Sequence, residues 1–208
     1  MHQGPAKSDL TVMLGRALDL LDRALVIVTA AGELVFRNRQ AARLLAAGHG
    51  GLRITGGALS SNSTRVRVAL AEAISLACNA LQPTGVCLPQ PCFPPERWLR
   101  LAVAPIHAGG SARRAGCAAV WIVRSGYPSR PNEVLLAALF GLTPAEARLA
   151  GAMLTGCAAN EYARQAGVGV VTVRSQLHSI FVKTGVRRQA QLVALLSKVP
   201  ALTLTDEA

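Results

Sequence analysis

Apolar and polar positions alternate along the first part of the chain with two different spacings. From residue 10 to residue 21 the apolar side chains recur at steps of three and four, which predicts a helix to about residue 22 capped by Ser8 or Asp9. Such a leading helix belongs either in the core or against the same helix of a second copy. Residues 1–7, before it, are predicted to lack regular structure. The apolar positions of the helix are Leu10, Met13, Leu14, Ala17, Leu18 and Leu21.

Strand-like runs dominate the next hundred residues. Residues 24–29 and 33–37 are rich in β-branched and large apolar side chains and flank a turn with Gly32, which predicts a hairpin. Asn38 is then expected to cap a helix to about Ala47, and residues 51–59 predict two short extended pieces around a turn. Residues 63–80 keep a helical apolar period. Three further strands are expected at 85–88, 98–106 and 117–124, the last two joined by a basic, Gly-rich loop.

The order of these elements predicts the architecture of residues 8–125. A hairpin, then helices, then three strands give a five-stranded antiparallel sheet with helices on one face. This layout resembles a PAS-type sensor domain. The resemblance implies a module that senses a signal or dimerises, and it identifies no effector, because fold alone does not set function.

Residues 126–132 contain two prolines among polar residues and are expected to be a linker, followed by a purely helical region to residue 200. A short apolar helix is predicted from Glu133 to Phe140. Thr143, Pro144 and Glu146 then have the order of a helix start: a cap, a proline in the first turn and the acid of a capping box. This helix is expected to run to Thr155.

Two helices around a glycine turn follow. A short helix is predicted at 160–166, a turn at 167–169, a longer helix ending at Gly185, and a fourth helix from Arg188 or Gln189 to Lys198. The longer helix has one apolar face and one polar face with no acid. It is either an ordinary amphipathic surface helix or a helix that docks on its own domain and presents its outer face to the major groove of DNA. Its apolar face comprises Val173, Leu177, Ile180 and Phe181, its opposite face Val171, Ser175, His178 and Val182, and one flank Thr172, Gln176 and Lys183.

This second region resembles the LuxR-type DNA-binding domain, with residue type and spacing matched over about 60 residues. The resemblance implies a four-helix helix-turn-helix domain of a bacterial, cytoplasmic transcriptional regulator. It also implies double-stranded DNA as the partner, a homodimer, contact with RNA polymerase and no enzymatic activity. The chain is thus expected to be α+β, with an all-α C-terminal domain at 133–200. The matching residues are Leu142, Thr143, Pro144, Glu146, Gly156, Glu161, Tyr162, Ala163, Gly167, Val168, Thr172, Val173, Arg174, Leu177, Ile180, Phe181, Lys183, Gly185, Val186, Leu192 and Val193.

The resemblance assigns roles to residues of the third helix. Base-reading positions correspond to Arg174, Ser175 and His178, of which Arg174 suits a bidentate contact to guanine; the other two are either base contacts or solvated side chains. Positions that hold the phosphate backbone correspond to Thr172, Gln176 and Lys183, and Arg188 is either a further backbone contact or a solubilising charge.

Two positions depart from the family pattern. The hydroxyl that usually caps the second helix is replaced by Ala158, and Gly169 replaces the usual cap of the third helix. Both changes predict weaker anchoring of phosphate by one domain, which a pair of domains on a repeated or palindromic site would offset.

Charge and composition add limited support. The formal net charge is +11 over 208 residues, but residues 1–141 hold 15 basic and 7 acidic side chains, while residues 142–208 hold 7 and 4. The basic surplus is therefore not concentrated in the segment expected to bind DNA. Arginine outnumbers lysine 19 to 3, which reflects genomic base composition as well as function.

The sequence gives little support for metal binding, catalysis or membrane insertion. Five cysteines without a C-x-x-C pair argue against zinc; they are expected to be reduced and mostly buried, with redox sensing by Cys87 and Cys92 as the alternative. His107 is either a haem ligand or a solvated residue at a strand end. No nucleophile–base pair, carboxylate pair or phosphate loop indicates catalysis, and no cofactor is expected. No segment predicts a membrane span or a secretory signal.

An RNA-polymerase specificity subunit of the sigma type is the alternative function, because sigma factors carry a similar C-terminal module. That alternative requires a helical N-terminal polymerase-binding domain, and residues 24–125 predict a mixed α/β domain.

Overall fold

The chain folds into two compact units, Met1–Tyr127 and Pro128–Ala208. The computed structural model describes residues 7–89, 98–106, 116–124, 132–199 and 201. Residues 1–6, most of the predicted linker at 126–132, most of the predicted loop at 109–116, His107 and Cys92 lie outside the described residues, so the expectations about them stay predictions.

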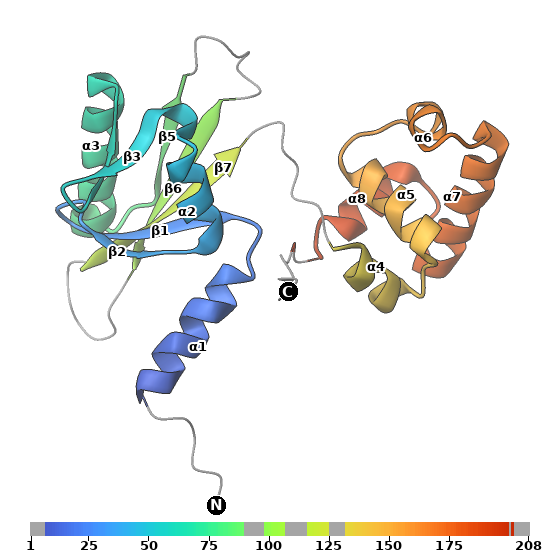
Figure 1. Cartoon of the computed structure of the whole chain (residues 1–208), viewed down its shortest axis with the longest axis horizontal. Helices are drawn as coiled ribbons and strands as arrows, with labels where there is room; N and C mark the ends of the chain where they lie inside the picture. Colours follow the sequence, from blue (N-terminus) through green and yellow to red (C-terminus); the bar gives the residue numbers. More distant parts are fainter. Residues whose placement is uncertain (1–6, 90–97, 107–115, 125–131, 200, 202–208) are drawn as a thin grey trace, which may run out of the picture. The chain divides into compact units, whose positions relative to one another are not determined.

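The N-terminal unit is built on the five-stranded antiparallel sheet that the sequence predicts (Figure 1). Its strands lie in the order β2-β1-β7-β6-β5, and a two-stranded hairpin, β3-β4, is joined to the start of β2 by an isolated bridge between Glu33 and Ala58. The unit is α+β and has the PAS-like layout of a hairpin, helices and three strands. Its elements are α1 (Lys7–Asp19), β1 (Ala24–Thr29), β2 (Leu34–Arg37), α2 (Arg39–Ala46), the 3-10 turn η1 (His49–Gly51), β3 (Leu52–Thr55), β4 (Ala58–Ser61), α3 (Thr64–Ala80), β5 (Thr84–Leu88), β6 (Leu99–Ile106) and β7 (Cys117–Arg124).

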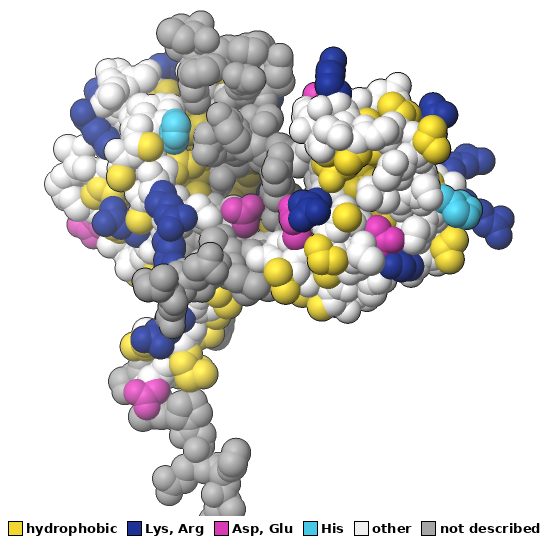
Figure 2. All heavy atoms as spheres, turned by 45° about the vertical axis from the view of Figure 1, so that its right-hand side comes forward, with side chains coloured by type: hydrophobic (Ala, Val, Ile, Leu, Met, Phe, Trp, Pro, Cys, Tyr) yellow, Lys and Arg dark blue, Asp and Glu magenta, His cyan; other side chains and the backbone are white. Residues whose placement is uncertain are grey.

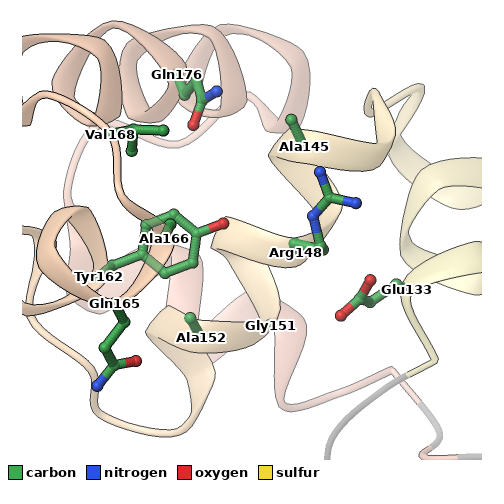
Figure 3. A pocket seen from close by; sticks show the side chains of 10 residues that line it. All are labelled: Glu133, Ala145, Arg148, Gly151, Ala152, Tyr162, Gln165, Ala166, Val168 and Gln176. Atoms are coloured by element: carbon green, nitrogen blue, oxygen red, sulfur yellow. The ribbon is translucent and has the colours of Figure 1, made fainter.

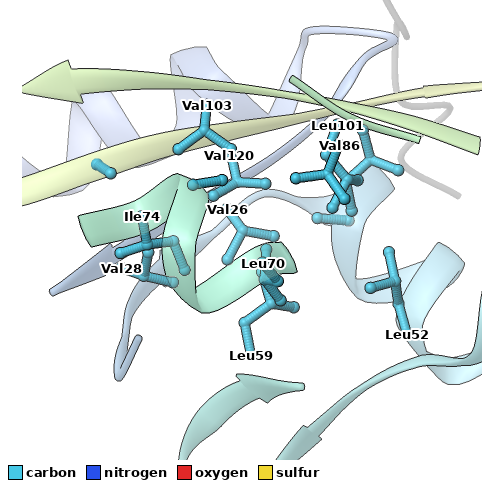
Figure 4. Close-up of a cluster of buried hydrophobic side chains, with 14 of the residues drawn as sticks. Val26, Val28, Leu52, Leu59, Leu70, Ile74, Val86, Leu101, Val103 and Val120 are labelled. Carbon is cyan, nitrogen blue, oxygen red and sulfur yellow. The ribbon is translucent and has the colours of Figure 1, made fainter. Parts of the chain in front are cut away.

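One face of this sheet forms the core (Figure 4). Alternate residues of β6 and β7 point to the same side because the side-chain period of a strand is two, and they meet α2, α3 and the β3-β4 hairpin. The hairpin contributes Leu52 and Leu59 to the same cluster, so it covers part of the core although its strands are not part of the five-stranded sheet.

Asn38 connects three elements at the edge of this core. Its side-chain oxygen accepts from the backbone N–H of Ala41, which caps α2 as predicted, and also from the N–H of Leu25 in β1, both at 3.0 Å. Its amide nitrogen donates to the carbonyls of Leu18 and Arg23, at 3.1 and 2.8 Å. A fully buried amide with all of these partners fixes the end of α1 against the sheet.

The leading helix differs from the prediction in its bounds and in its burial. It begins at Lys7, so Ser8 and Asp9 lie inside its first turn and neither is its cap; it also ends at Asp19, before residue 22. Met13 and Leu14 are 57% and 56% exposed, so the apolar stripe does not enter the core. A Cβ atom added at Gly15 would lie 3.8 Å from the ring of Phe36 of β2, which is an ordinary contact distance.

The C-terminal unit contains the helices that the sequence predicts, with bounds shifted by one or two residues. Asn132 caps α4 by accepting from the N–H of Val134, and Gly141 ends it in the left-handed conformation. The capping box of Thr143 and Glu146 is present, with Pro144 in the first turn of α5. The helices are α4 (Glu133–Phe140), α5 (Pro144–Leu154), α6 (Ala159–Ala166), α7 (Val170–Thr184) and α8 (Gln189–Leu196).

Candidate nucleic-acid interface

Helix α7 has the two faces that its sequence predicts. Val173 and Ile180 are fully buried and Leu177 nearly so, in a cluster that also holds residues of α4, α5, α6 and α8. On the opposite side Val171 is 81% exposed and Val182 69% exposed. Burial of one face fixes the helix on its domain, and the other face stays open to a partner.

The three predicted base-reading residues lie on this open side. Arg174, Ser175 and His178 are all exposed, and none of them has a hydrogen-bond or ion-pair partner within the described part of the chain. The sequence of α7 contains no acid that would compete with DNA for Arg174. The side chains are therefore free to donate or accept at base edges.

The flank of α7 that holds Lys183 faces α5 through a hydrogen-bond network around Glu146. Lys183 Nζ donates to Glu146 Oε2 and Ser179 Oγ donates to Glu146 Oε1, both at 2.6 Å. The N–H of Thr143 donates to the same carboxylate at 2.7 Å. One acid thus caps α5 and holds α7, and the predicted phosphate contact of Lys183 would have to form beside this ion pair.

The electrostatics of Glu146 follow from these contacts. The side chain is only 8% exposed, and burial alone would raise the pKa of a carboxyl group. The Lys183 ammonium and the Ser179 hydroxyl outweigh that effect and lower the pKa of Glu146 to about 2. The carboxylate is therefore charged over the whole neutral range and keeps its hold on α7.

The other residues that are predicted to contact the phosphate backbone of DNA lie in different surroundings. Thr172 is exposed in the first turn of α7, while Gln176 is half-buried one turn later. Arg188 is exposed at the N-terminal end of α8, where its own side chain makes no capping bond. Thr172 and Gln176 share the flank of Lys183, whereas Arg188 comes from the loop that follows α7.

The turn between α6 and α7 depends on Gly167, whose φ of 67° ends α6 in the left-handed region. The N-terminal end of α6 lacks a side-chain cap, because Ala158 has an extended backbone and no hydroxyl. The same is true of Gly169 before α7. Both departures from the family pattern therefore leave backbone N–H groups of the two helices without a side-chain partner.

A groove of about 490 Å³ lies in the C-terminal unit between α5, α6 and α7 (Figure 3). Arg148 stands on one side of it; the Tyr162 hydroxyl and the Gln176 amide point into it from α6 and α7. Small side chains line much of the rest. Lys and Arg side chains project from the edge of this unit (Figure 2).

Sequence reasoning missed two parts of this site. Glu146 was interpreted only as a capping residue, although a single acid with Ser179 and Lys183 one helical turn apart on α7 is a signal for a shared contact. The groove was missed because its residues come from separate helices, and no local pattern unites Arg148 with Tyr162 and Gln176.

The cysteines differ in part from the expectation. Cys78 is buried. Its burial is the larger cause, and the nearby Cys117 the smaller cause, of a raised pKa of its thiol. Cys87 is exposed, and Cys117 and Cys157 are partly exposed, so the expectation of mostly buried thiols is wrong for the four described cysteines. Within the described ranges no group of three His, Cys, Asp or Glu side chains is arranged to hold a metal ion.

No single helix of the described residues is long and apolar enough to cross a membrane. Helices α4 and α5 satisfy the length and composition criteria only as a pair bent by 112°, and both contribute to the C-terminal core.

No protein-family model and no curated protein matches the sequence. Similar solved structures include a VqmA dimer of Vibrio cholerae, described as a LuxR-type receptor, with a TM-score of 0.38, 12% identity and coverage of 92% of this chain and 86% of that one. A phage VqmA bound to DPO has a TM-score of 0.37 and 13% identity, with 93% of each chain covered. The PAS domain of Bordetella pertussis BvgS has a TM-score of 0.40 and 10% identity, covering 63% of this chain and 94% of that one.

These similar structures are of the two kinds that the sequence resembles, LuxR-type regulators and PAS domains. At such low identities and TM-scores they add nothing to an argument about function, which rests on the residues of this chain.

Proposed function

We propose that the chain is a sequence-specific DNA-binding transcriptional regulator in which α7 enters the major groove. The observation that carries this proposal is the open face of α7, where three polar side chains without partners stand on a helix whose other face is fully packed. An exposed valine at each end of that face, Val171 and Val182, is available for contact with thymine methyl groups.

Roles follow for the residues of this helix. Arg174 reads guanine bidentately, and Ser175 and His178 contact neighbouring base edges. Thr172 and Gln176, with Lys183 and Arg188, contact the phosphate backbone and set the register of the helix in the groove.

The functional unit in this proposal is a pair of chains. The uncapped α6 and α7 weaken the hold of one domain on DNA, and two domains on two half-sites offset that weakness. The exposed apolar side chains of α1 supply a surface for pairing, and the PAS-like unit senses a signal or carries this dimer contact.

The sigma-type alternative is less well supported. It requires a helical N-terminal domain, and residues 24–124 of this chain instead carry the five strands of one sheet.

Selection from a pool of random double-stranded DNA with the full chain tests the proposal. Enrichment of one motif made of two related half-sites is expected. Recovery of an unenriched pool at every salt concentration would reject sequence-specific binding.

A further inference from the structure

The groove between α5, α6 and α7 brings Gln176 together with two side chains, Arg148 and Tyr162, to which no role has been assigned above. Four side chains with hydrogen-bond donors line it. The Gln165 amide already donates to Glu161 at 3.0 Å, which leaves the Arg148 guanidinium, the Tyr162 hydroxyl and the Gln176 amide (Figure 3). Within the described residues none of these three side chains has a hydrogen-bond or ion-pair partner. Donors that converge on one groove without partners define a site for an acceptor.

The small side chains on the walls of the groove leave room for an elongated ligand to approach. Ala145, Ala152 and Ala166 line it with single methyl groups. A Cβ atom added at Gly151 would meet no atom within 4 Å, so open space lies directly against the backbone of α5. The one carboxylate of the lining belongs to Glu133, which stands on the Arg148 side of the groove in Figure 3.

The position of the groove relates it to DNA. Gln176 belongs to α7 and follows the exposed Thr172 by one helical turn, so the groove continues the flank expected to follow the phosphate backbone. On that flank the charge of Lys183 is already engaged by Glu146. Of the described residues that line the groove, Arg148 is the cation, and it is exposed.

We propose that Arg148, Tyr162 and Gln176 form a seat for one phosphate of the DNA backbone. The inference rests on the proposed function and adds a contact from α5 and α6 that the resemblance does not assign. Arg, Tyr and Gln side chains are all among the usual donors to phosphate, and a phosphate oxygen accepts from several donors at once.

Binding of the full chain to its selected site and to unrelated DNA, measured over a range of salt concentrations, tests the seat. Arg148→Ala is expected to weaken both complexes roughly tenfold and to reduce the salt slope by about one. Tyr162→Phe, which removes only the hydroxyl, is expected to weaken both by a smaller and equal factor. Arg164→Ala removes the same charge from α6 at an exposed position that does not line the groove, and is the matched control.

The outcomes separate the two proposals. Equal affinities and salt slopes for Arg148→Ala and the control would overturn the seat while leaving sequence-specific binding by the wild type intact. Loss of base preference in Arg148→Ala would also overturn it, because a phosphate contact carries no sequence information. Unchanged DNA binding with reduced activation of transcription would assign the groove to an acidic protein surface. A wild-type chain that selects no sequence would reject the proposed function and the seat together.

Discussion

Glu146 of α5 and Lys183 of α7, 37 residues apart, form an ion pair of 2.6 Å that holds the proposed recognition helix to α5. The carboxylate is buried and the ammonium is about one-third exposed. A charge removed from water is stabilising only where partners surround it, and here Ser179 and the N–H of Thr143 complete the shell. The orientation of α7 therefore depends on one acid in α5.

The pH dependence of stability should reveal this acid. Because the pKa of Glu146 is lowered from 4.5 to about 2 in the folded chain, its charged form stabilises the fold above pH 4.5. That contribution, about 3 kcal/mol, is lost as the pH falls from 4.5 towards 2. Urea unfolding should show wild type more stable than Glu146→Gln at pH 6, with the difference shrinking at pH 3. A constant difference would contradict the assignment.

Lys183 is expected to act on the fold as well as on DNA. Lys183→Met should lower the free energy of unfolding by about 1–3 kcal/mol, because it leaves the Glu146 carboxylate without its charged partner. In a Glu146→Gln background the same substitution should lower the free energy of unfolding by less. A double-mutant cycle measures this difference, which is the coupling between the two side chains. If Lys183 also contacts phosphate, Lys183→Ala weakens all DNA sequences alike and flattens the salt dependence. Additive stability losses would argue that the two side chains do not interact.

The missing cap of α6 offers a gain in stability. Ala158 has the extended backbone of a cap residue, with φ of −75° and ψ of 152°, and lacks only the oxygen. Ala158→Ser should raise the free energy of unfolding by about 1 kcal/mol and strengthen DNA binding if its hydroxyl also reaches a phosphate. Ala158→Val, which adds a side chain without an acceptor, is the control. Equal stability of the two variants would show that no cap forms.

The exposed stripe of α1 predicts a dimer contact. Replacing Met13 or Leu14 by Glu places a charge on the apolar surface, which should convert the proposed dimer to a monomer in light scattering. Affinity for a two-half-site DNA should fall, while affinity for a single half-site should not change. Lys7 and Arg16 lie on the same helix, and Arg16→Glu is a control for charge alone. A variant that remains dimeric would place the contact elsewhere.

Local signals predicted much of this fold. The predicted helix ends in the C-terminal unit follow from Thr143 and three glycines, each of which acts on its own backbone neighbours. The burial of α7 follows from its 3.6-residue period, which places Val173 and Ile180 on one face.

Contacts between distant parts of the chain were harder to predict. The start of α1 was placed too late because Ser8 and Asp9 both have the chemistry of a cap, and a pattern of apolar residues does not say what covers them. Three of the four bonds of Asn38, those with Leu18, Arg23 and Leu25, and the pair of Glu146 with Lys183 are set by packing across 13 to 37 residues. Sequence periodicity contains no information about such partners.

The most direct test of the central claim compares the DNA sequences selected by wild type and by Arg174→Ala at one salt concentration. If α7 reads the major groove, Arg174→Ala should lose its preference at one base pair in each half-site, at a cost of about 1–3 kcal/mol on the preferred sequence. The preference at the other positions should remain. An unchanged motif selected with unchanged affinity would contradict the claim that the open face of α7 reads DNA.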